Sequence, residues 1–485
     1  MNYPLPEGFS VAIDPSTRRV NARTLVGGSP PRILRLTDVG QQAWSELARG
    51  PAHSHNARVL GRLLTDVSAA HPRPNATCEP PKVTVVIPVR DRPQSLKRCL
   101  ASLRYGHPIV IVDDASVDPT AVAELAESFG ARLIRRSTCG GPAAARNTGL
   151  KAVETAVVAF LDSDCVCVDD WIGRLIEHFA DPLVAAVAPR IAALPSSTAA
   201  GRFATSSGAL DLGARECRVM PGAAVPYVPT AALLVRREAI DDIGAFDERL
   251  RFGEDVDLVW RLHRAGKLIR YQPDVRVLHA EPADWASLWT RRFQYGTSAA
   301  PLACRHPEAI APLVLHPWPS AVLVCLLARR PLIAALIVAV TAVPATRGWR
   351  RSGVPTRVAA KIALQGVFQT YCAVGRYCTQ FGGPLLLLAL AWRGGTKTFQ
   401  RRRRTAAAAL LFAAPLRAAF SGEMQPDPFR FLVGHLADNM MYGAGVWFGC
   451  LRHRTLIPVR PKVVGPRRLP AVGIPRRFNK RQQRS

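Results

Sequence analysis

The sequence lacks the cysteine patterns that form disulfide bonds or bind structural zinc in small domains. Its eleven cysteines are odd in number and scattered, and none of them forms a C-x-x-C pair. A disulfide framework needs paired cysteines, and structural zinc needs clusters of Cys and His at short spacings. The pattern therefore argues against both, and Cys165 and Cys167 are expected to be small buried residues rather than ligands.

The chain is also short of acids and of recognisable targeting signals. Lys and Arg number 64 against 36 acids, which gives a net charge of +28. Zinc-finger spacings and aromatic RNP-like patterns are absent, so no nucleic acid is expected as a partner. An anionic membrane surface is favoured instead, with general solubility as the alternative. The N-terminus has no basic and then apolar signal pattern, so the folded domains are expected to face the reducing cytosol.

Length and composition divide the chain into several units. At about 150 residues per domain, 485 residues suggest about three. Residues 1–75 predict a small α+β unit, with alternating apolar residues from Phe9 and a helix capped at Thr37 or Asp38. This unit is similar to small domains that hold precursor peptides, and a packing or dimerisation domain is the alternative. Residues 71–77 are interpreted as the linker that follows it.

A β-α-β unit follows at Lys82. Apolar β-branched runs at 83–89 and 108–112 predict strands, and Leu96, Leu100 and Leu103 predict the helix between them. Continuous apolar strands joined by a helix are typical of a parallel sheet covered on both faces. Such sheets bind ligands beyond the carboxyl ends of their strands. The acids at those ends are Asp91, Asp113 and Asp114.

Two further acidic clusters come later in the chain. Asp162, Ser163 and Asp164 follow an apolar run, and Glu254-Asp255 with Asp257 open a helical pattern. Carboxylates two residues apart on an extended segment suit a hard divalent cation and a ligand hydroxyl.

Six pieces in order carry a family resemblance: IPVRD, VDDASVD, ARNTGL, FLDSD, GAFDERLRFGEDVDLVWRL and VLH. Over residues 82–300 they resemble the inverting nucleotide-sugar glycosyltransferases of family two. The resemblance implies an α/β, Rossmann-like GT-A domain there and a hexosyltransferase activity.

The resemblance also implies how the donor is bound. Asp164 of the D-x-D element would bind Mn²⁺ or Mg²⁺, with His279 completing the metal shell or, alternatively, serving as a core histidine. Asp114 would accept a hydrogen bond from the base, with a helix cap as the alternative. The other residues expected around the nucleotide sugar are Pro88, Arg90, Asp91, Arg146, Asp162 and Ser163. For Arg146 two roles stay open, which are diphosphate binding and holding the acidic loop.

The acceptor side centres on Asp255, which we expect to be the general base because a carboxylate at a helix start can deprotonate a hydroxyl. Glu254 and Asp257 are the alternatives. With one base and no second carboxylate placed as a nucleophile, the resemblance implies inversion. The family's Q-x-x-R-W motif corresponds here to a stretch with Trp289, Arg292 and Phe293, which together with Glu254 are the expected acceptor-binding residues. The Gln is missing and Phe replaces Trp, which puts processivity in doubt.

The remaining chain is apolar and basic. Residues 305–455 hold apolar runs, most of them shorter than the roughly 20 residues of a membrane span or broken by pairs such as Arg329-Arg330. Spanning, re-entrant and interfacial helices all fit, as does a soluble helical bundle. Residues 456–485 are a basic tail expected to be disordered. We expect the protein at the cell membrane, with its catalytic domain facing the cytoplasm.

The layout of the whole chain resembles the glycosyltransferases of mycofactocin systems. The pieces are the N-terminal GGSPPRILRLT, the elements FGEDVDLVWRL and RRFQYG, and the basic C-terminal third. This resemblance implies transfer of β-linked glucose from UDP-glucose onto premycofactocin, a peptide-derived redox cofactor. The alternatives are a membrane glycosyltransferase with a polyprenyl or cell-wall acceptor and a catalytically dead sugar-nucleotide-binding module.

Overall fold

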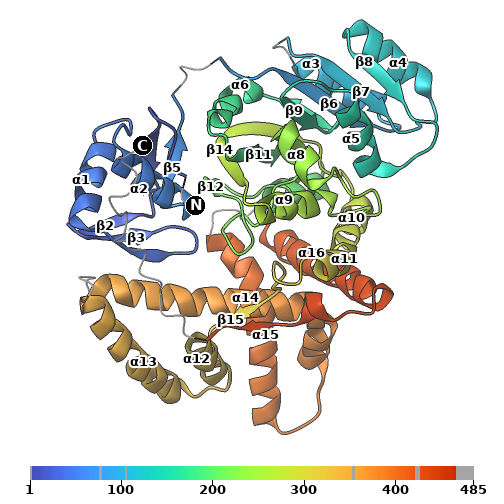
Figure 1. Cartoon of the computed structure of the whole chain (residues 1–485). Helices are drawn as coiled ribbons and strands as arrows, with labels where there is room; N and C mark the ends of the chain where they lie inside the picture. The colour runs from blue at the N-terminus through green and yellow to red at the C-terminus, as the bar shows by residue number, and fades with distance from the viewer. Residues whose placement is uncertain (1–2, 76–78, 104–105, 352–355, 421–426, 466–485) are drawn as a thin grey trace.

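The structure is a computed structural model that describes residues 3–75, 79–103, 106–351, 356–420 and 427–465. It has three parts, which are a small N-terminal unit, a central domain around one large sheet, and a layer of long helices beneath them (Figure 1).

The N-terminal unit is α+β, as predicted. Thr37 caps the first helix by accepting a hydrogen bond from the amide of Gly40. The elements are β1 (Ser10–Ile13), β2 (Arg18–Asn21), β3 (Thr24–Gly27), β4 (Arg32–Arg35), α1 (Asp38–Leu47), α2 (His55–Asp66) and β5 (Ala70–Arg73).

The linker prediction is wrong for its first residues. Ala70–Arg73 form β5, which pairs antiparallel with β1, whereas β2, β3 and β4 make a separate antiparallel sheet. Two ion pairs fix the unit to the central domain, and the first of them is buried. Arg62 lies 2.7 Å from Asp181, and Arg73 lies 2.7 Å from Glu216.

The central domain is a nine-stranded mixed sheet with the order β10-β14-β11-β13-β9-β6-β7-β8, and β12 pairs with β14. Its strands are β6 (Val83–Val89), β7 (Ile109–Asp113), β8 (Arg132–Arg135), β9 (Val157–Leu161), β10 (Cys165–Cys167), β11 (Val184–Ala193), β12 (Cys217–Arg218), β13 (Ala232–Arg236) and β14 (Leu268–His279). Its helices are α3 (Pro93–Ser102), α4 (Pro119–Ser128), α5 (Gly141–Lys151), α6 (Trp171–Ile176), α7 (Ala199–Ser207), α8 (Arg237–Ile243), α9 (Glu254–Arg264), α10 (Trp285–Thr297) and α11 (Ala299–Arg305).

Helices cover both faces of this sheet, as continuous apolar strands require. Val85 and Ile87 of β6 pack with residues of α3, α4 and α6, whereas Val86 packs with residues of α5, α8 and α9. This alternation follows from the two-residue period of a strand. Strands β6, β7, β8 and β9 are parallel, so the carboxyl ends of β6, β7 and β9 meet at one edge. The predicted β-α-β unit and its ligand-binding edge are thus present.

The C-terminal region is a layer of helices that packs beneath the central domain, mainly by α16 against α10 (Figure 1). The elements are β15 (Val314–Leu315), α12 (Pro317–Leu327), α13 (Pro331–Arg351), α14 (Thr356–Ala391), α15 (Lys397–Phe420), α16 (Pro428–Arg452) and β16 (Lys462–Val463).

The structure divides the apolar run 317–345 and corrects one expectation, that of a disordered tail. The run forms two helices, because α12 ends at Leu327 and the backbone turns at Arg329, whose φ is +57°. Within the described ranges, no helix combines the length and apolar character that crossing a membrane requires. The tail is ordered at its start, since β16 pairs in parallel with β15. Residues 466–485 lie outside the described residues.

Candidate active site

The D-x-D element lies directly after β9, beside the end of β14. The β10–β14 register places Cys165 opposite His279, so the imidazole of His279 comes to lie next to Asp164. His279 Nε2 is 3.3 Å from Asp164 Oδ1, and the amide of Ala280 donates to the carbonyl of Asp164. The sheet itself therefore brings together the two residues predicted to hold a metal.

This pair has the donor chemistry of a site for a divalent cation. His279 Nδ1 lies 3.1 Å from Glu281 Oε1, so a carboxylate orients the imidazole from behind, as is usual for metal-binding histidines. Mg²⁺ in nucleotide enzymes is commonly held by one or two protein ligands plus substrate phosphates. In the part of the chain that the structure describes, no group of three or more His, Cys, Asp or Glu side chains is placed to hold a metal alone.

Opposing effects act on the protonation of the pair. Burial alone would raise the pKa of Asp164, but the hydrogen bond with His279 and the charges of His279, Arg92 and Arg291 lower this pKa to about 2. Burial lowers the pKa of His279, but the hydrogen bonds with Asp164 and Glu281 raise it to about 10. Asp164 is therefore a carboxylate at neutral pH, whereas His279 carries a proton that it would have to release to bind a cation.

Arg92 is a site residue that the sequence did not single out. Its Nη1 donates to Asp164 Oδ2 at 2.6 Å, and its side chain is about half exposed. A solvated arginine beside the D-x-D carboxylate places positive charge where a diphosphate would lie. The signal in the sequence was its position directly after β6, at the ligand-binding edge.

Arg146 joins the acidic clusters to each other. From α5, its Nη2 donates to Asp162 Oδ1 at 2.7 Å, and its Nη1 donates to Glu254 Oε1 at 2.8 Å. Burial disfavours the charged guanidinium, but the charges of Asp162 and Glu254 raise the pKa of Arg146. These contacts hold the acidic loop, which is one of the two roles left open for Arg146.

Asp255 follows Glu254 in the first turn of α9. The residue before the helix, Gly253, has φ +82°, and a Cβ there would lie 3.0 Å from the Cβ of Ser298. Glycine meets both constraints, because it adopts positive φ without strain and has no side chain to clash. The backbone bend at Gly253 directs the start of α9 toward the D-x-D loop, where Arg146 binds Glu254.

The environment of Asp255 differs from that of its neighbours. Burial and the charge of Glu254 raise its pKa to about 7 from an ordinary 3.8, although the amide of Val256 donates to it. The other predicted alternative, Asp257, is committed to ion pairs with Arg261 at 2.7 Å and His306 at 2.9 Å. A carboxyl group with a pKa near the working pH suits a general base.

The predicted base-binding residue, Asp114, lies at the end of β7 as expected. It accepts hydrogen bonds from Arg136 Nε at 2.8 Å and from the amides of Gly140 and Gly141 at 3.0 and 2.7 Å. The N-cap of α4 is Asp118, whose side chain accepts hydrogen bonds from two backbone amides of that helix. The turn at Gly140 and Gly141, where α5 begins, thus donates two of its amides to Asp114.

The strand β6 supplies the rest of the nucleotide side. Pro88 lies in β6, and Asp91, just beyond it, accepts a hydrogen bond from the amide of Val117 at 2.7 Å. Arg90 lies 3.3 Å from Asp91 and contacts Cys139 Sγ. Ser163 is buried inside the D-x-D loop. Apart from Arg146 on α5, the residues predicted for the donor therefore lie along one edge of the sheet.

The predicted acceptor residues on α10 are engaged in packing. Trp289 stacks on Trp285, with ring centroids 5.1 Å apart. Arg292 donates to Asp438 of α16 at 2.6 Å, and Phe293 contacts Phe448 of the same helix. These three side chains attach the helical region to the central domain, which the motif alone could not indicate.

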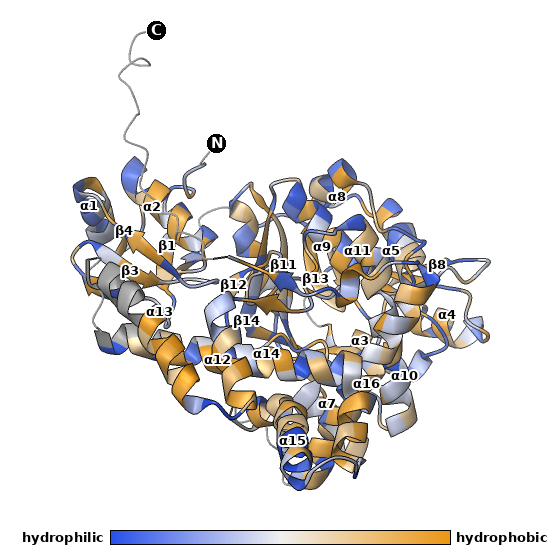
Figure 2. Ribbon diagram, turned by 90° about the horizontal axis from the view of Figure 1, so that it is seen from below, coloured by the Kyte–Doolittle hydropathy of each residue, from blue (hydrophilic) through white to orange (hydrophobic). Residues whose placement is uncertain are grey.

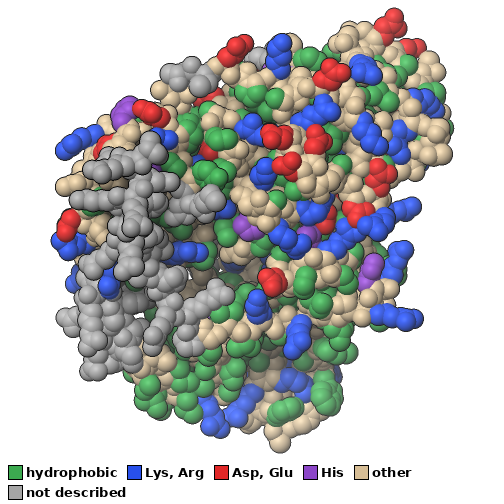
Figure 3. All heavy atoms as spheres, viewed as in Figure 1, with side chains coloured by type: hydrophobic (Ala, Val, Ile, Leu, Met, Phe, Trp, Pro, Cys, Tyr) green, Lys and Arg blue, Asp and Glu red, His purple; other side chains and the backbone are tan. Residues whose placement is uncertain are grey.

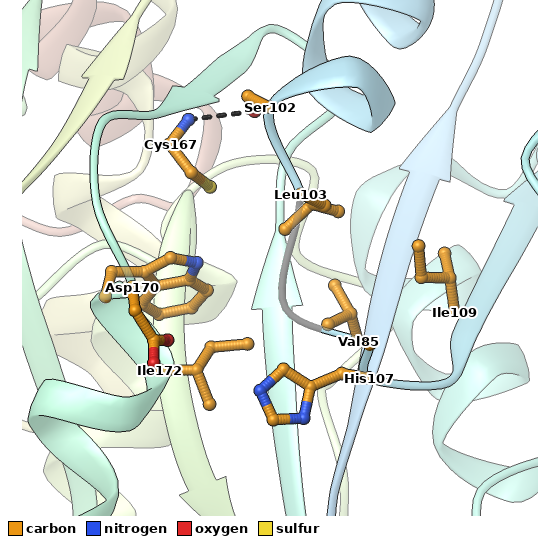
Figure 4. Close-up of a pocket in the computed structure, with 10 residues that line it drawn as sticks. Val85, Ser102, Leu103, His107, Ile109, Cys167, Asp170 and Ile172 are labelled. Atoms are coloured by element: carbon orange, nitrogen blue, oxygen red, sulfur yellow. Dashed lines mark hydrogen bonds between the residues drawn. The ribbon is translucent and has the colours of Figure 1, made fainter.

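Another hollow lies away from this edge. Val85, Leu103, Ile109 and Cys167 line it, near the amino ends of β6 and β7 (Figure 4). The hydroxyl of Ser102 accepts a hydrogen bond from the amide of Cys167 there. None of the carboxylates of the acidic clusters lines this hollow, and Cys165 and Cys167 are buried, as predicted.

Comparisons with known proteins show the family to which this chain belongs. The profile of glycosyl transferase family 2 matches residues 84–244. A pre-mycofactocin glycosyltransferase of Mycobacterium tuberculosis is 36% identical over 477 residues, covering 95% of this chain and 98% of the relative. A poly-beta-1,6-N-acetyl-D-glucosamine synthase of Staphylococcus aureus is 27% identical over 204 residues, 41% of this chain and 49% of the synthase.

Among solved structures, a mannosyltransferase from Pyrobaculum calidifontis, in complex with GDP-Man and Mn²⁺, is 20% identical. It covers 72% of this chain and 90% of its own, with a TM-score of 0.39, which is too low to carry an argument. The near full-length match to the mycobacterial relative is decisive. The chain therefore belongs to the family of pre-mycofactocin glycosyltransferases, and its central domain contains a glycosyl transferase family 2 domain.

Proposed function

We propose that this protein is an inverting, metal-dependent hexosyltransferase that moves glucose from UDP-glucose onto premycofactocin and builds a β-linked oligosaccharide. The observation that carries the proposal is the Arg146 bridge between Asp162 and Glu254. It holds the donor motif and the acceptor motif against each other, with Asp255 beside them. The choice of acceptor rests on the name of the mycobacterial relative, which covers almost the whole chain.

Each group of residues has one task in this reaction. Asp164 and His279 would hold Mn²⁺ or Mg²⁺, which when bound supplies a Lewis acid for the leaving diphosphate. Asp114 and the residues around Asp91 bind the nucleotide. Asp255 takes the proton of the acceptor hydroxyl, whose oxygen attacks the anomeric carbon from the face opposite the diphosphate. An α-linked donor then gives a β-linked product and UDP.

The partners of the carboxylates support inversion. Retention through a covalent intermediate would need a carboxylate free to attack the sugar. Asp162 and Glu254 are both held by Arg146, whereas the Asp255 carboxylate accepts a hydrogen bond from the amide of Val256. One carboxylate is therefore left for the role of base.

A donor and acceptor screen tests the proposal. The full-length purified protein would be given UDP-glucose, GDP-mannose or UDP-N-acetylglucosamine with Mn²⁺ and either premycofactocin or a polyprenyl phosphate. Mass spectrometry should show hexose added to premycofactocin from UDP-glucose, and EDTA should abolish it. Preference for polyprenyl phosphate would instead support the membrane glycosyltransferase, and UDP release without any glycosylated acceptor would contradict both.

The pH dependence of the reaction should follow Asp255. A base must be deprotonated to act, and the pKa of Asp255 is raised to about 7. We therefore expect kcat/KM to rise with pH up to about 7 and to level off above it. A pH profile with saturating metal measures this. A profile that is flat between pH 5 and 8 would exclude Asp255 as the base.

We also propose that the helical region binds an anionic membrane surface at the cytoplasmic side of the cell membrane. Most of the exposed large apolar side chains belong to α12–α16, and hydrophobic residues run along α12, α13 and α14 (Figure 2). Leu332, Leu336 and Val340 of α13 are 85%, 62% and 62% exposed and share one helix face. Contiguous apolar surface of this kind marks interaction sites.

Charge complementarity points to anionic lipid. Residues 317–462 hold 20 Lys or Arg but three Asp or Glu. Hydrophobic side chains and cations lie together at the lower edge of the molecule (Figure 3). Trp392 is 63% exposed, with the guanidinium of Arg403 at 4.9 Å from its ring. Aromatic rings and arginines that lie at the same depth are typical of proteins at the headgroup region of a bilayer.

Vesicle sedimentation tests the membrane surface. The protein should bind vesicles that contain phosphatidylglycerol more tightly than vesicles of phosphatidylcholine alone. A variant with Leu332→Ser, Leu336→Ser and Val340→Ser should bind at least tenfold more weakly, because three exposed apolar side chains that would enter the bilayer are lost. Val168→Ser, at an exposed apolar residue of the central domain, is the control. Equal binding by all three proteins would contradict the proposal.

A further inference from the structure

A row of acidic and basic side chains in alternation runs through the donor site. Arg291 of α10 lies 3.6 Å from Glu281, and Glu281 lies 3.1 Å from His279. His279 lies 3.3 Å from Oδ1 of Asp164, whose Oδ2 lies 2.6 Å from Arg92 at the end of the row. Both carboxylate oxygens of Asp164 are therefore in contact with a basic side chain.

The two ends of this row differ in exposure. The side chain of Arg291 is 23% exposed, whereas that of Arg92 is 54% exposed. Among the residues that the structure describes, the ion-pair partner of Arg92 is Asp164. Water screens a half-exposed pair and makes it weak. Arg92 can therefore exchange this carboxylate for a partner that binds it better.

The backbone next to Arg92 is anchored to the loop that follows β7. The amide of Asp91 donates to Ser116 Oγ at 2.9 Å, and the carboxylate of Asp91 accepts from the amide of Val117 at 2.7 Å. Arg92 then takes the N-cap position of α3. Its long side chain thus starts from a fixed point at the edge of the sheet where the donor is proposed to bind.

The other arginine of the D-x-D element is held much more firmly. The side chain of Arg146 is 4% exposed, and its two terminal nitrogens bind Asp162 and Glu254. If Arg146 moved, two carboxylates would lose their partner in a buried site, which is costly. Arg92 would leave only Asp164 behind, and a divalent cation bound there would compensate that carboxylate.

We propose that Arg92 occupies the place of the cation on Asp164 and turns to the diphosphate of the donor when the cation binds. A divalent cation on Asp164 repels a guanidinium that touches the same carboxylate. The diphosphate reaches this edge together with the cation, and a planar guanidinium can bind phosphate oxygens through two hydrogen bonds. The inference rests on the proposed metal-dependent function and adds a donor-binding residue to it.

Arg92→Gln tests the inference through two effects of opposite sign. Without nucleotide, the full-length variant should bind Mn²⁺ about twofold to fivefold more tightly than the wild type, because the cation no longer competes with a half-exposed guanidinium. With saturating Mn²⁺, its affinity for UDP should instead fall about tenfold, because a charged hydrogen bond to the diphosphate is lost. Electron paramagnetic resonance of unbound Mn²⁺ measures the first effect, and calorimetric titration of UDP measures the second.

Arg98→Gln is the matched control. Arg98 is an exposed arginine on the same helix, 3.4 Å from Ser95, so the variant loses the same charge away from Asp164. Both affinities should stay at the wild-type values. Arg92→Lys keeps the charge and should recover part of the affinity for UDP. In an Asp164→Ala background, Arg92→Gln should no longer increase the affinity for Mn²⁺.

The outcomes separate the inference from the function on which it rests. A weaker or unchanged affinity of Arg92→Gln for Mn²⁺ alone would overturn the inference, because partial unfolding would also weaken binding and only the loss of a competitor strengthens it. Unchanged UDP affinity in the presence of Mn²⁺ would overturn it as well. Both results leave the proposed function intact if the wild type binds UDP more tightly with Mn²⁺. If Mn²⁺ has no effect on UDP binding by the wild type, the metal-dependent function and the inference are both contradicted.

Discussion

Asp255→Asn should lower kcat by about a hundredfold to ten-thousandfold, which is the usual contribution of a general base, and leave the affinity for UDP-glucose near that of the wild type. The amide has nearly the shape of the carboxyl group but cannot take the proton of the acceptor. The donor residues lie along the edge of β6, β7 and β9, and the change does not touch them. Single-turnover transfer and donor titration measure the two effects separately.

Stability separates Asp255 from Asp257, its closest control. A folded-state pKa raised above the ordinary 3.8 means that the Asp255 carboxyl is destabilising when ionised, so its contribution to stability falls as pH rises from about 4 to 7. Asp255→Asn removes this loss and should not lower the unfolding temperature at pH 8. Asp257→Asn breaks buried ion pairs with Arg261 and His306 and should lower the unfolding temperature but keep kcat. The opposite outcome would make Asp257 the base.

Asp164→Ala should abolish the metal dependence of donor binding and reduce transfer by at least a hundredfold. It removes the carboxylate that lies 3.3 Å from His279, so one of two protein ligands is lost. Titration of UDP with and without Mn²⁺ measures the effect directly. The variant should bind UDP with the same weak affinity in both conditions.

Asp169→Ala is the matched control for Asp164→Ala. Asp169 lies five residues later, its side chain is 67% exposed, and its ion pair with Arg174 is loose at 3.8 Å. Surface pairs of this kind contribute little to stability. Both Mn²⁺-dependent UDP binding and turnover should survive this change. Full turnover by Asp164→Ala would show that the D-x-D element does not hold the cation.

The parts of the fold that the sequence predicted well are those where burial is complete. The runs around Val85 and Ile111 are apolar throughout because both faces of their strands are covered. The strand β5 was missed because His71-Pro72 resembles a linker, although His71 is buried against Asp14 at 2.9 Å. Burial of a polar residue depends on a partner that is distant in the chain. Local patterns carry no signal for it.

For the site residues too, the sequence did not indicate partners that are distant in the chain. The acids Asp114, Asp164 and Asp255 could be singled out because strand ends and helix starts are recognisable in sequence. Their cationic partners could not be assigned, because Arg92 and Arg146 reach carboxylates far along the chain. The break at Arg329 was visible as a charged pair, but only the backbone shows that two helices meet there. Which charged side chains pair depends on the folded structure, and no periodic pattern in the sequence indicates it.

The account depends most on a cation held at the end of β14, with Asp255 at the start of α9, which Arg146 links to the D-x-D element through Glu254. Anomalous diffraction at the manganese edge, from crystals grown with UDP and MnCl₂, tests this directly. We predict one manganese peak within bonding distance of Asp164 and His279 and of the UDP phosphates. A manganese peak bound by other side chains, or UDP bound with no manganese at Asp164, would contradict the account.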